Sequence, residues 1–150
     1  MVGRTESLLW RRGNTAGTWD DVICNALLEQ HDAKITLSPG FRWGTTLLPD
    51  TDITAENVWA QNAITYPAAY RSVMKGAAIK ALLEDIPDNL FRPDLFHQQG
   101  GDMVRIGGIT FSLNVAAGVG QHQSSDARPT DLRFGIPLSG QRADQYHSNP

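Results

Sequence analysis

Residues 18–37 decide the fold first, and they read TWDDVICNALLEQHDAKITL. Apolar residues recur there at helical spacing, at Trp19, Val22, Ile23, Ala26 and Leu27. Thr18 can cap this helix, and Asp20 and Asp21 suit the positive end of its dipole. Residues 33–37 then predict a short strand. A helix followed by a strand indicates an α+β domain.

Shorter elements follow along the chain. Residues 38–52 predict a loop rich in Gly and Pro, and Thr54 begins a helical turn. Two stretches, 63–67 and 70–74, predict extended segments. A second main helix stops around Pro87. Its apolar stripe is Ile79, Leu82, Leu83 and Ile86.

The C-terminal part predicts strands and then a tail. Alternation in residues 109–115 predicts a half-buried strand, and residues 132–134 and 136–138 predict a hairpin. Residues 140–150 are a polar tail. We therefore expect one α+β domain over residues 1–139, with a mixed sheet and two main helices. The hairpin would leave a sheet edge uncovered, which predicts truncation at the C-terminus.

Composition excludes several classes of protein. The 150 residues are 41% hydrophobic and 19% charged, as in an ordinary globular domain. A net charge of −3 gives no electrostatic case for nucleic-acid binding. No apolar run is long enough for a membrane span. Cys24, the lone cysteine, falls between inward positions of the first helix, so a buried thiol is expected rather than a nucleophile.

No catalytic signature is present in the sequence. H-E-x-x-H, G-x-S-x-G, a P-loop and paired zinc cysteines are all absent. The histidines are far apart, at 31, 97, 122 and 147. We therefore expect neither a catalytic residue nor a metal ligand set in this chain.

Two glycine-rich loops each present an arginine, Arg42 in residues 38–44 and Arg105 in residues 98–108. Glycines let a backbone approach a ligand closely, and a guanidinium matches the oxygens of phosphate or sulfate. The pattern indicates an oxyanion ligand. The alternative is that the glycines only form turns and the arginines are solvated or pair with Asp50 or Asp102.

Aromatic residues give a second indication of a ligand site. Phe41, Trp43 and Tyr66 follow predicted strands and could line a cleft, although core positions at strand ends are the alternative. Arg11 and Arg12 are ambiguous, since such pairs are usually solvated. The candidate substrate-binding residues are Arg12, Gly40, Arg42, Trp43, Gly44, Tyr66, Gly100, Gly101, Asp102 and Arg105.

Arg42 ranks first among these candidates. It follows the predicted strand and lies between Gly40 and Gly44, so that an oxyanion could approach it. The competing interpretation is that Arg42 pairs with Asp50 or Asp52 and only holds the loop.

Several strings of residues carry a family resemblance. They are RTES (4–7), RRGN (11–14), SPGFRWGTTLLP (38–49), ITYP (64–67) and QQGGDMVR (98–105). Together they resemble the C-terminal domain of SoxB-type thiosulfohydrolases, within the 5′-nucleotidase C-terminal domain family. The resemblance extends to about Gly120. Pro87 departs from it, because relatives carry another residue there.

The resemblance implies a two-domain periplasmic hydrolase. Its N-terminal metallophosphatase domain would hold two manganese ions, and its metal-binding strings do not occur here. The C-terminal domain would close over a cysteine-bound thiosulfonate on the Sox sulfur carrier protein, which is hydrolysed to release sulfate. This chain would then be a substrate-recognition domain, inactive alone. Two alternatives stay open: the corresponding domain of a generic 5′-nucleotidase, and an independent binding or structural module.

Overall fold

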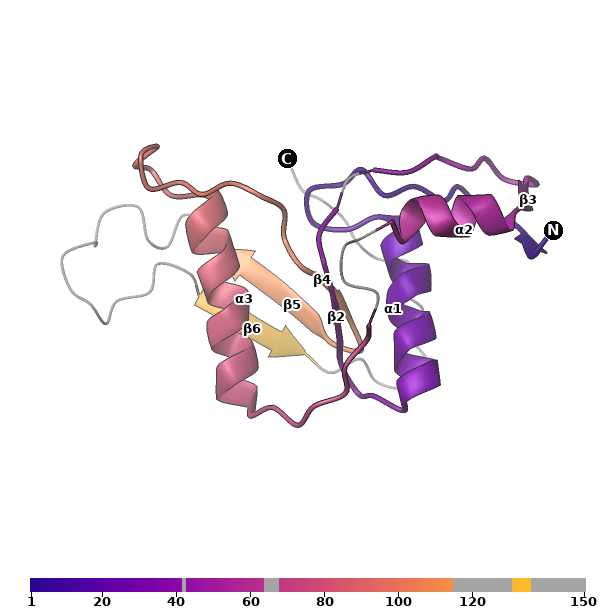
Figure 1. Ribbon diagram of the computed structural model, residues 1–150. Helices are drawn as coiled ribbons and strands as arrows, with labels where there is room; N and C mark the ends of the chain where they lie inside the picture. The colour runs from indigo at the N-terminus through magenta and orange to yellow at the C-terminus, as the bar shows by residue number, and fades with distance from the viewer. Residues whose placement is uncertain (42, 64–67, 115–130, 136–150) are drawn as a thin grey trace.

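The computed structural model describes residues 1–41, 43–63, 68–114 and 131–135 (Figure 1). Within these ranges the helices are α1 (Thr18–His31), α2 (Ala55–Gln61) and α3 (Gly76–Leu90). The strands pair two by two: β1 (Gly3–Arg4) with β3 (Asp52–Ile53), β2 (Thr36–Ser38) with β4 (Arg105–Gly107), and β5 (Thr110–Asn114) with β6 (Asp131–Gly135). The expected combination of helices and sheet is confirmed. A mixed sheet is not, because every strand pair in the described ranges is antiparallel.

The two long helices flank the strands. α1 packs against β2 and β4, and α3 packs against β6 (Figure 1). α2 lies near β3, beyond the end of α1 at which that helix begins. The N-terminal segment is tied to this region by the pairing of β1 with β3 and by a bridge between Leu9 and Leu47. Segments separated by more than 35 residues within the first half of the chain therefore meet near the N-terminal end of α1.

The predicted first helix is confirmed, but the role given to Thr18 is wrong. Gly17 is the N-cap, and no side chain caps the helix. The Thr18 hydroxyl instead donates to the Leu8 carbonyl at 2.7 Å and accepts from the Trp10 amide at 3.0 Å. Thr18 therefore fastens the preceding segment to α1 rather than closing the helix end.

α2 begins as the sequence predicts. Thr54 is its N-cap and forms a capping box with Asn57, each side chain accepting from the other residue's backbone N–H. Such a box satisfies two backbone donors that a helix start otherwise leaves free. It fixes the point at which the chain turns from β3 into α2.

The predicted end of α3 at Pro87 is wrong, because the helix continues to Leu90. Proline fixes φ near the helical value and lacks an N–H donor, so Pro87 costs one hydrogen bond. That loss falls in the last turns, where Pro87 is buried and its carbonyl still accepts from the Phe91 amide at 2.8 Å. Burial of the ring offsets the lost hydrogen bond.

Two strand predictions and one loop prediction need correction. The strand expected at 33–37 begins only at Thr36, and the loop expected at 98–108 contains β4, its partner. Residues 70–74 join no strand among the described residues. β6 pairs with β5. Its predicted partner, 136–138, lies outside the described residues, as do 64–67 and the tail 140–150.

Leu83 and Met103 form the centre of the core between α3 and β4. Leu83 is fully buried and Met103 is 2% exposed. Partly buried apolar residues surround them, namely Leu37, Ile79, Leu82, Ile86, Leu90, Val104, Ile106, Ile109 and Phe111. The apolar stripe predicted for the second helix therefore faces the core, and Met103 carries the packing into the segment that leads to β4.

Shortening Leu83 tests this core. We expect Leu83→Ala to lower the free energy of unfolding by about 2–5 kcal/mol, because it removes buried methyl groups and leaves a cavity. Urea denaturation followed by circular dichroism measures the loss. The control is Val73→Ala at a fully exposed position. A comparable loss at both positions would contradict this assignment of the core.

Candidate functional site

Three stretches that carry candidate residues come together in the structure: residues 11–14, 38–44 and 102–105. The Met103 amide donates to the Asn14 carbonyl at 3.3 Å, which joins the first stretch to the third. An added Cβ at Gly40 would lie 2.2 Å from the Met103 carbonyl oxygen, so the second and third stretches touch through their backbones. The two arginine-bearing loops therefore form one surface rather than two.

A buried carboxylate lies beneath this surface. Asp20, in the first turn of α1, accepts from Arg11 Nε at 2.6 Å and lies 3.1 Å from Arg105 Nε. All three side chains are at most 2% exposed. Charges taken out of water require close partners. Asp20 here lies between two guanidinium groups, and this arrangement is called the Asp20 cluster below.

Other N–H groups of the two guanidiniums donate hydrogen bonds to backbone carbonyls. Arg11 donates to the Gln61 carbonyl at 2.5 Å and to the Pro39 carbonyl at 3.0 Å. Arg105 donates to the carbonyls of Asn14 and Gly13 at 2.9 and 2.7 Å. The Asp20 cluster therefore holds all three stretches and the end of α2 in one arrangement.

Sequence reasoning missed Arg11 as a structural residue. It treated Arg11 and Arg12 alike, whereas Arg11 is buried and Arg12 is exposed. From the sequence, the helix dipole alone accounts for Asp20 in the first turn of α1. A buried acid has the same sequence signature as a surface acid at that position, so only the fold reveals that Asp20 pairs with Arg11.

Arg105 is in the interior. The sequence predicts that Arg105 contacts an oxyanion, or else is solvated or pairs with Asp50 or Asp102, but its guanidinium faces Asp20 and two carbonyl groups. At 1% exposure it presents no surface to a ligand from solvent. This geometry favours a structural role for Arg105, whereas Asp102 is only partly buried beside Gly40.

Gln61 supports the loop from the other side. Its side chain is fully buried and donates to the Thr45 carbonyl at 2.8 Å. Gly44 has φ +91°, and an added Cβ would lie 2.3 Å from the Gln61 amide nitrogen. Both the backbone conformation and the lack of space therefore require glycine at position 44.

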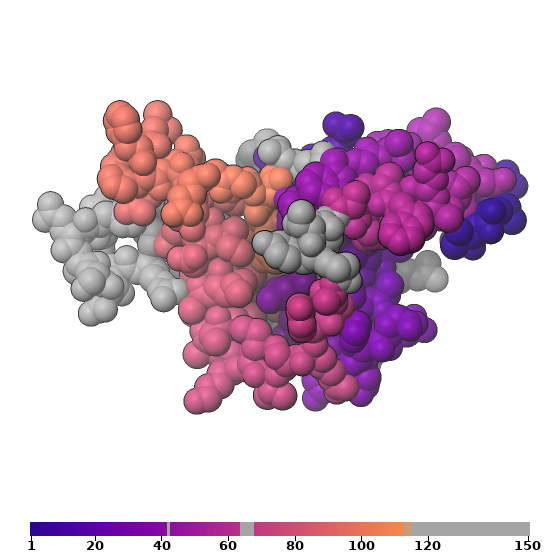
Figure 2. All heavy atoms as spheres, in the orientation of Figure 1, coloured from indigo at the N-terminus to yellow at the C-terminus, as the bar shows by residue number. Residues whose placement is uncertain are grey.

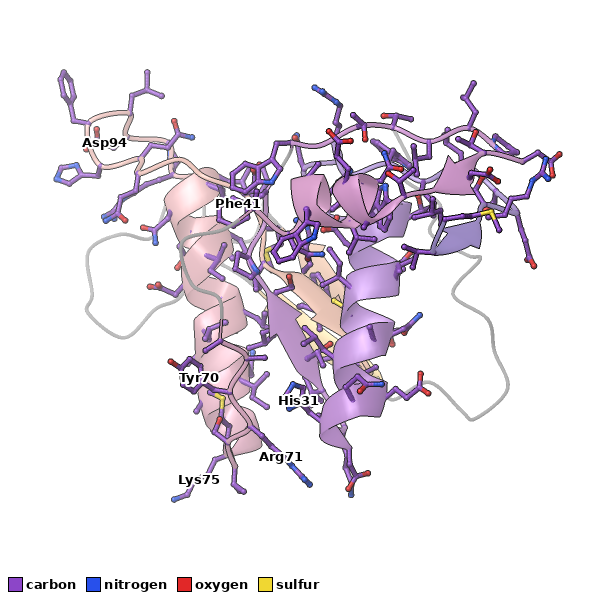
Figure 3. The ribbon with its side chains drawn as sticks, turned by 45° about the vertical axis from the view of Figure 1, so that its right-hand side comes forward. His31, Phe41, Tyr70, Arg71, Lys75 and Asp94 are labelled. Atoms are coloured by element: carbon purple, nitrogen blue, oxygen red, sulfur yellow. The ribbon has the colours of Figure 1, made fainter. Side chains whose placement is uncertain are left out.

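The accessible part of the loop is aromatic. The rings of Phe41 and Trp43 stack with centroids 3.9 Å apart, and the Arg11 guanidinium lies 5.9 Å from the Phe41 ring centre. Trp43 is 37% exposed, and Phe41 lies toward the end of the molecule at which α3 ends (Figure 3). Phe41 is half-buried and Trp43 is exposed, so neither is a fully buried core residue, and their lining of a cleft stays a prediction. Tyr66 and Arg42 lie outside the described residues.

Gly100 and Gly101 lie in the exposed segment that leads into the third stretch. Both have positive φ, +73° and +100°, and an added Cβ would meet no other atom within 4 Å at either position. They are required for the course of the chain rather than for close packing. Their predicted contact with a substrate stays a prediction.

A cavity of about 50 Å³ lies behind the Asp20 cluster. It is lined by Thr15, Ala16, Asp20, Asp21, Cys24, Arg105, Ile106 and Phe111. This volume suits one or a few water molecules rather than a substrate. Burial raises the pKa of the Cys24 thiol, so the thiolate is disfavoured and the expectation of an unreactive buried cysteine is supported.

The described residues contain no group of three or more His, Cys, Asp or Glu side chains that could hold a metal ion. The family resemblance likewise implies manganese ions in an N-terminal domain rather than among these residues. None of the helices in the described ranges is both long and apolar enough to cross a bilayer.

Comparison with known proteins identifies a similar solved structure. No family model and no curated protein matches the sequence. The structure is similar to the sulfate thiohydrolase SoxB of Thermus thermophilus in complex with glycerol, with a TM-score of 0.77 and 35% identity. The match covers 89% of this chain and 23% of that protein's chain. The chain thus has the fold of a SoxB-like domain and spans about a quarter of the protein it matches.

Neutralising Asp20 tests the cluster. We expect Asp20→Asn to lower the free energy of unfolding by about 3–5 kcal/mol at neutral pH, because two buried arginines lose their charged partner. Urea denaturation measures the change. A loss below 1 kcal/mol would contradict the role of the cluster.

The neighbouring Asp21→Asn is the matched control. Burial, and secondly the charge of Asp20, raise the pKa of Asp21. A raised pKa means that the folded state binds the proton more readily, so the favourable contribution of Asp21 is present at acid pH and lost as the pH rises through that pKa. We therefore expect Asp21→Asn to be neutral or slightly stabilising at pH 7, with no gain at pH 3.

The contact between the two loops is tested by Gly40→Ala. The methyl group would overlap the Met103 carbonyl, so we expect a loss of about 1–3 kcal/mol in unfolding free energy. Gly76→Ala is the control, because an added Cβ at the start of α3 meets nothing within 4 Å and should stabilise by about 0.4–1 kcal/mol. Equal effects of the two substitutions would show that the loops do not touch at Gly40.

Proposed function

We propose that this SoxB-like domain recognises the substrate of a periplasmic Sox thiosulfohydrolase. Such an enzyme hydrolyses a cysteine-bound thiosulfonate on a sulfur carrier protein and releases sulfate. The observation that carries the proposal is the similarity to Thermus thermophilus SoxB over 89% of this chain. The convergence of three of the resembling strings on one surface supports it.

The chain itself contributes binding rather than hydrolysis under this proposal. The described residues offer no metal ligand set, so the two manganese ions would belong to an N-terminal domain of the same enzyme. The loop of residues 38–44 offers an exposed Trp43 and, by sequence, Arg42 next to it. A planar guanidinium can bind two oxygens of a sulfonate at once.

The interior supports that loop without competing for the ligand. Arg11 and Arg105 have their donors directed to Asp20 and to backbone carbonyls, so their positive charges are paired within the domain. Arg12 is exposed on the adjacent stretch. We therefore assign the recognition of the anionic group to Arg42, with Arg12 as the second cation.

A nucleotide hydrolase is the second candidate. The stacked Phe41 and Trp43 favour it, because an exposed aromatic ring can bind a nucleobase by stacking. The two functions differ in the group that is recognised, which is a sulfonate on a peptide in one case and a base with a ribose in the other.

The complete enzyme containing this domain, loaded with Mn²⁺, tests the proposal. We expect sulfate release from a carrier protein bearing a cysteine thiosulfonate, little phosphate release from AMP, and no hydrolysis by the 150-residue chain alone. Preferential AMP hydrolysis by the complete enzyme would favour the nucleotidase. Hydrolysis by the isolated chain would contradict both assignments of this domain.

Arg42→Ala in the complete enzyme tests the assigned residue. We expect kcat/KM for the thiosulfonate to fall about ten- to a hundredfold, since a charge-assisted hydrogen bond contributes about 1.5–3 kcal/mol. Arg42→Lys should recover only part of this, because an ammonium lacks the planar fork. Arg71→Ala is the control, at an exposed arginine near Asp32 and the start of α3 (Figure 3). A lower melting temperature with normal turnover would instead give Arg42 a structural role.

A further inference from the structure

The turn that follows α3 exposes large apolar side chains. Phe96 is 100% exposed, Leu95 is 77% exposed and Phe91 is 48% exposed. Figure 2 shows this part of the chain protruding beyond the end of α3. Large apolar groups gathered on a protruding surface commonly mark an interaction site. Residues 91–97 are called the apolar turn below.

The apolar turn is held by its own hydrogen bonds. The Asp94 carboxylate accepts from the Phe96 amide at 3.1 Å and lies 2.6 Å from His97 Nδ1. The His97 amide donates to the Asp94 carbonyl at 3.1 Å. The hydrogen bond with His97 lowers the pKa of Asp94, which keeps this carboxylate ionised as an acceptor. Leu95 and Phe96 are therefore presented at the tip of a folded turn.

A second anchor joins the turn to the helix. The Gln98 side-chain amide donates to the Leu90 carbonyl at 2.5 Å, which satisfies one of the carbonyls left free at the end of α3. From Gln98 the chain passes through Gly100 and Gly101 into the stretch 102–105. The apolar turn is thus continuous with one of the stretches that form the candidate site.

The turn lies at the same end of the molecule as the candidate site. Asp94, in the turn, and Phe41, in the loop of residues 38–44, both lie toward the end of the molecule at which α3 ends, whereas Tyr70 and Lys75 lie toward the end at which it begins (Figure 3). A catalytic domain that acts on a substrate held at residues 38–44 must approach this end.

We propose that the apolar turn, through Leu95 and Phe96, is the docking element for the metal-bearing catalytic domain of the same enzyme. The proposal rests on the proposed function in requiring that second domain. The similar SoxB chain supports such an occupant, because this chain corresponds to only 23% of it.

The size of the turn favours a domain of the same polypeptide over a second copy of this chain. An aromatic side chain buries about 150–250 Å². Two phenylalanines and a leucine therefore bury less than the roughly 800 Å² per partner found in stable complexes. A covalent connection raises the effective concentration of the partner, so a small apolar contact suffices within one chain.

Thiol labelling tests the docking. Cys24 is buried and its pKa is raised, so it gives a slow background. We would place a single reporter with Phe96→Cys or Leu95→Cys at the tip, and with Val73→Cys at an equally exposed position as control. The labelled peptide is identified by mass spectrometry, so that thiols elsewhere in the enzyme do not contribute. Maleimide labelling rates are compared between the 150-residue chain and the complete enzyme.

We expect Phe96→Cys and Leu95→Cys to be labelled at least tenfold more slowly in the complete enzyme than in the 150-residue chain, with Val73→Cys labelled equally in both. Because Leu95→Cys keeps the Phe96 ring, it reports on docking even if Phe96→Cys weakens the contact. Equal labelling of both tip variants in the two contexts would overturn the proposal. Protection that instead rises with the concentration of the 150-residue chain identifies a second copy as occupant and also overturns it.

The labelling requires no substrate, so it separates this proposal from the proposed function. An enzyme that hydrolyses AMP rather than the thiosulfonate, yet protects the tip, would contradict the proposed function and retain the docking. An enzyme that releases sulfate but whose tip is labelled equally in both contexts would retain the proposed function and contradict the docking. Absence of any second domain from the complete polypeptide would contradict both.

Discussion

The carboxylate of Asp20 is the constraint on which the site depends. It lies between Arg11 and Arg105 in the interior, and each guanidinium also donates hydrogen bonds to backbone carbonyls of neighbouring segments. A buried charge without partners would cost several kcal/mol, so this carboxylate and the two arginines require one another. Because the acceptors belong to residues 13, 14, 39 and 61, satisfying the charges also fixes the backbone of the segments that carry the candidate binding residues.

Within these short segments, buried residues that support the fold lie next to exposed residues that are candidates for ligand binding. Arg11 faces inward while Arg12 beside it is exposed, and Gly40 and Gly44 pack tightly while Trp43 between them reaches solvent. A rigid loop loses little conformational freedom on binding, which favours affinity. The strand pairs are short and form few backbone hydrogen bonds between distant segments. Side-chain hydrogen bonds from Arg11, Arg105, Thr5 and Gln61 join these segments instead, as the backbone of a wide sheet does in other folds.

The sequence predicts the elements that have strong local signals and misses those that depend on distant partners. α1 and the core-facing stripe of α3 follow from apolar spacing, and α2 follows from its cap at Thr54. β1 has two residues and β4 has three, and each exists only through a partner far along the chain, so no local pattern reveals them. For the candidate site, the strings of glycine and arginine pointed to segments that the fold brings together, and their contact with a substrate stays a prediction. Arg11 and Arg105 are buried because they lie close to Asp20 in space, and the sequence pattern does not contain these distances.

The sequence separations within the Asp20 cluster bear on how the chain reaches its native state. The hydrogen bond from Arg105 to Gly13 closes a separation of 92 residues, and that from Arg11 to Gln61 closes one of 50. A contact between distant residues closes a long loop, which costs conformational entropy before the contact stabilises the fold. Such contacts therefore form late in folding. During synthesis from the N-terminus, Arg11 and Asp20 emerge long before Arg105 does. The loops of the candidate site therefore acquire their final arrangement only after most of the domain has left the ribosome, and until then Asp20 and Arg11 remain hydrated.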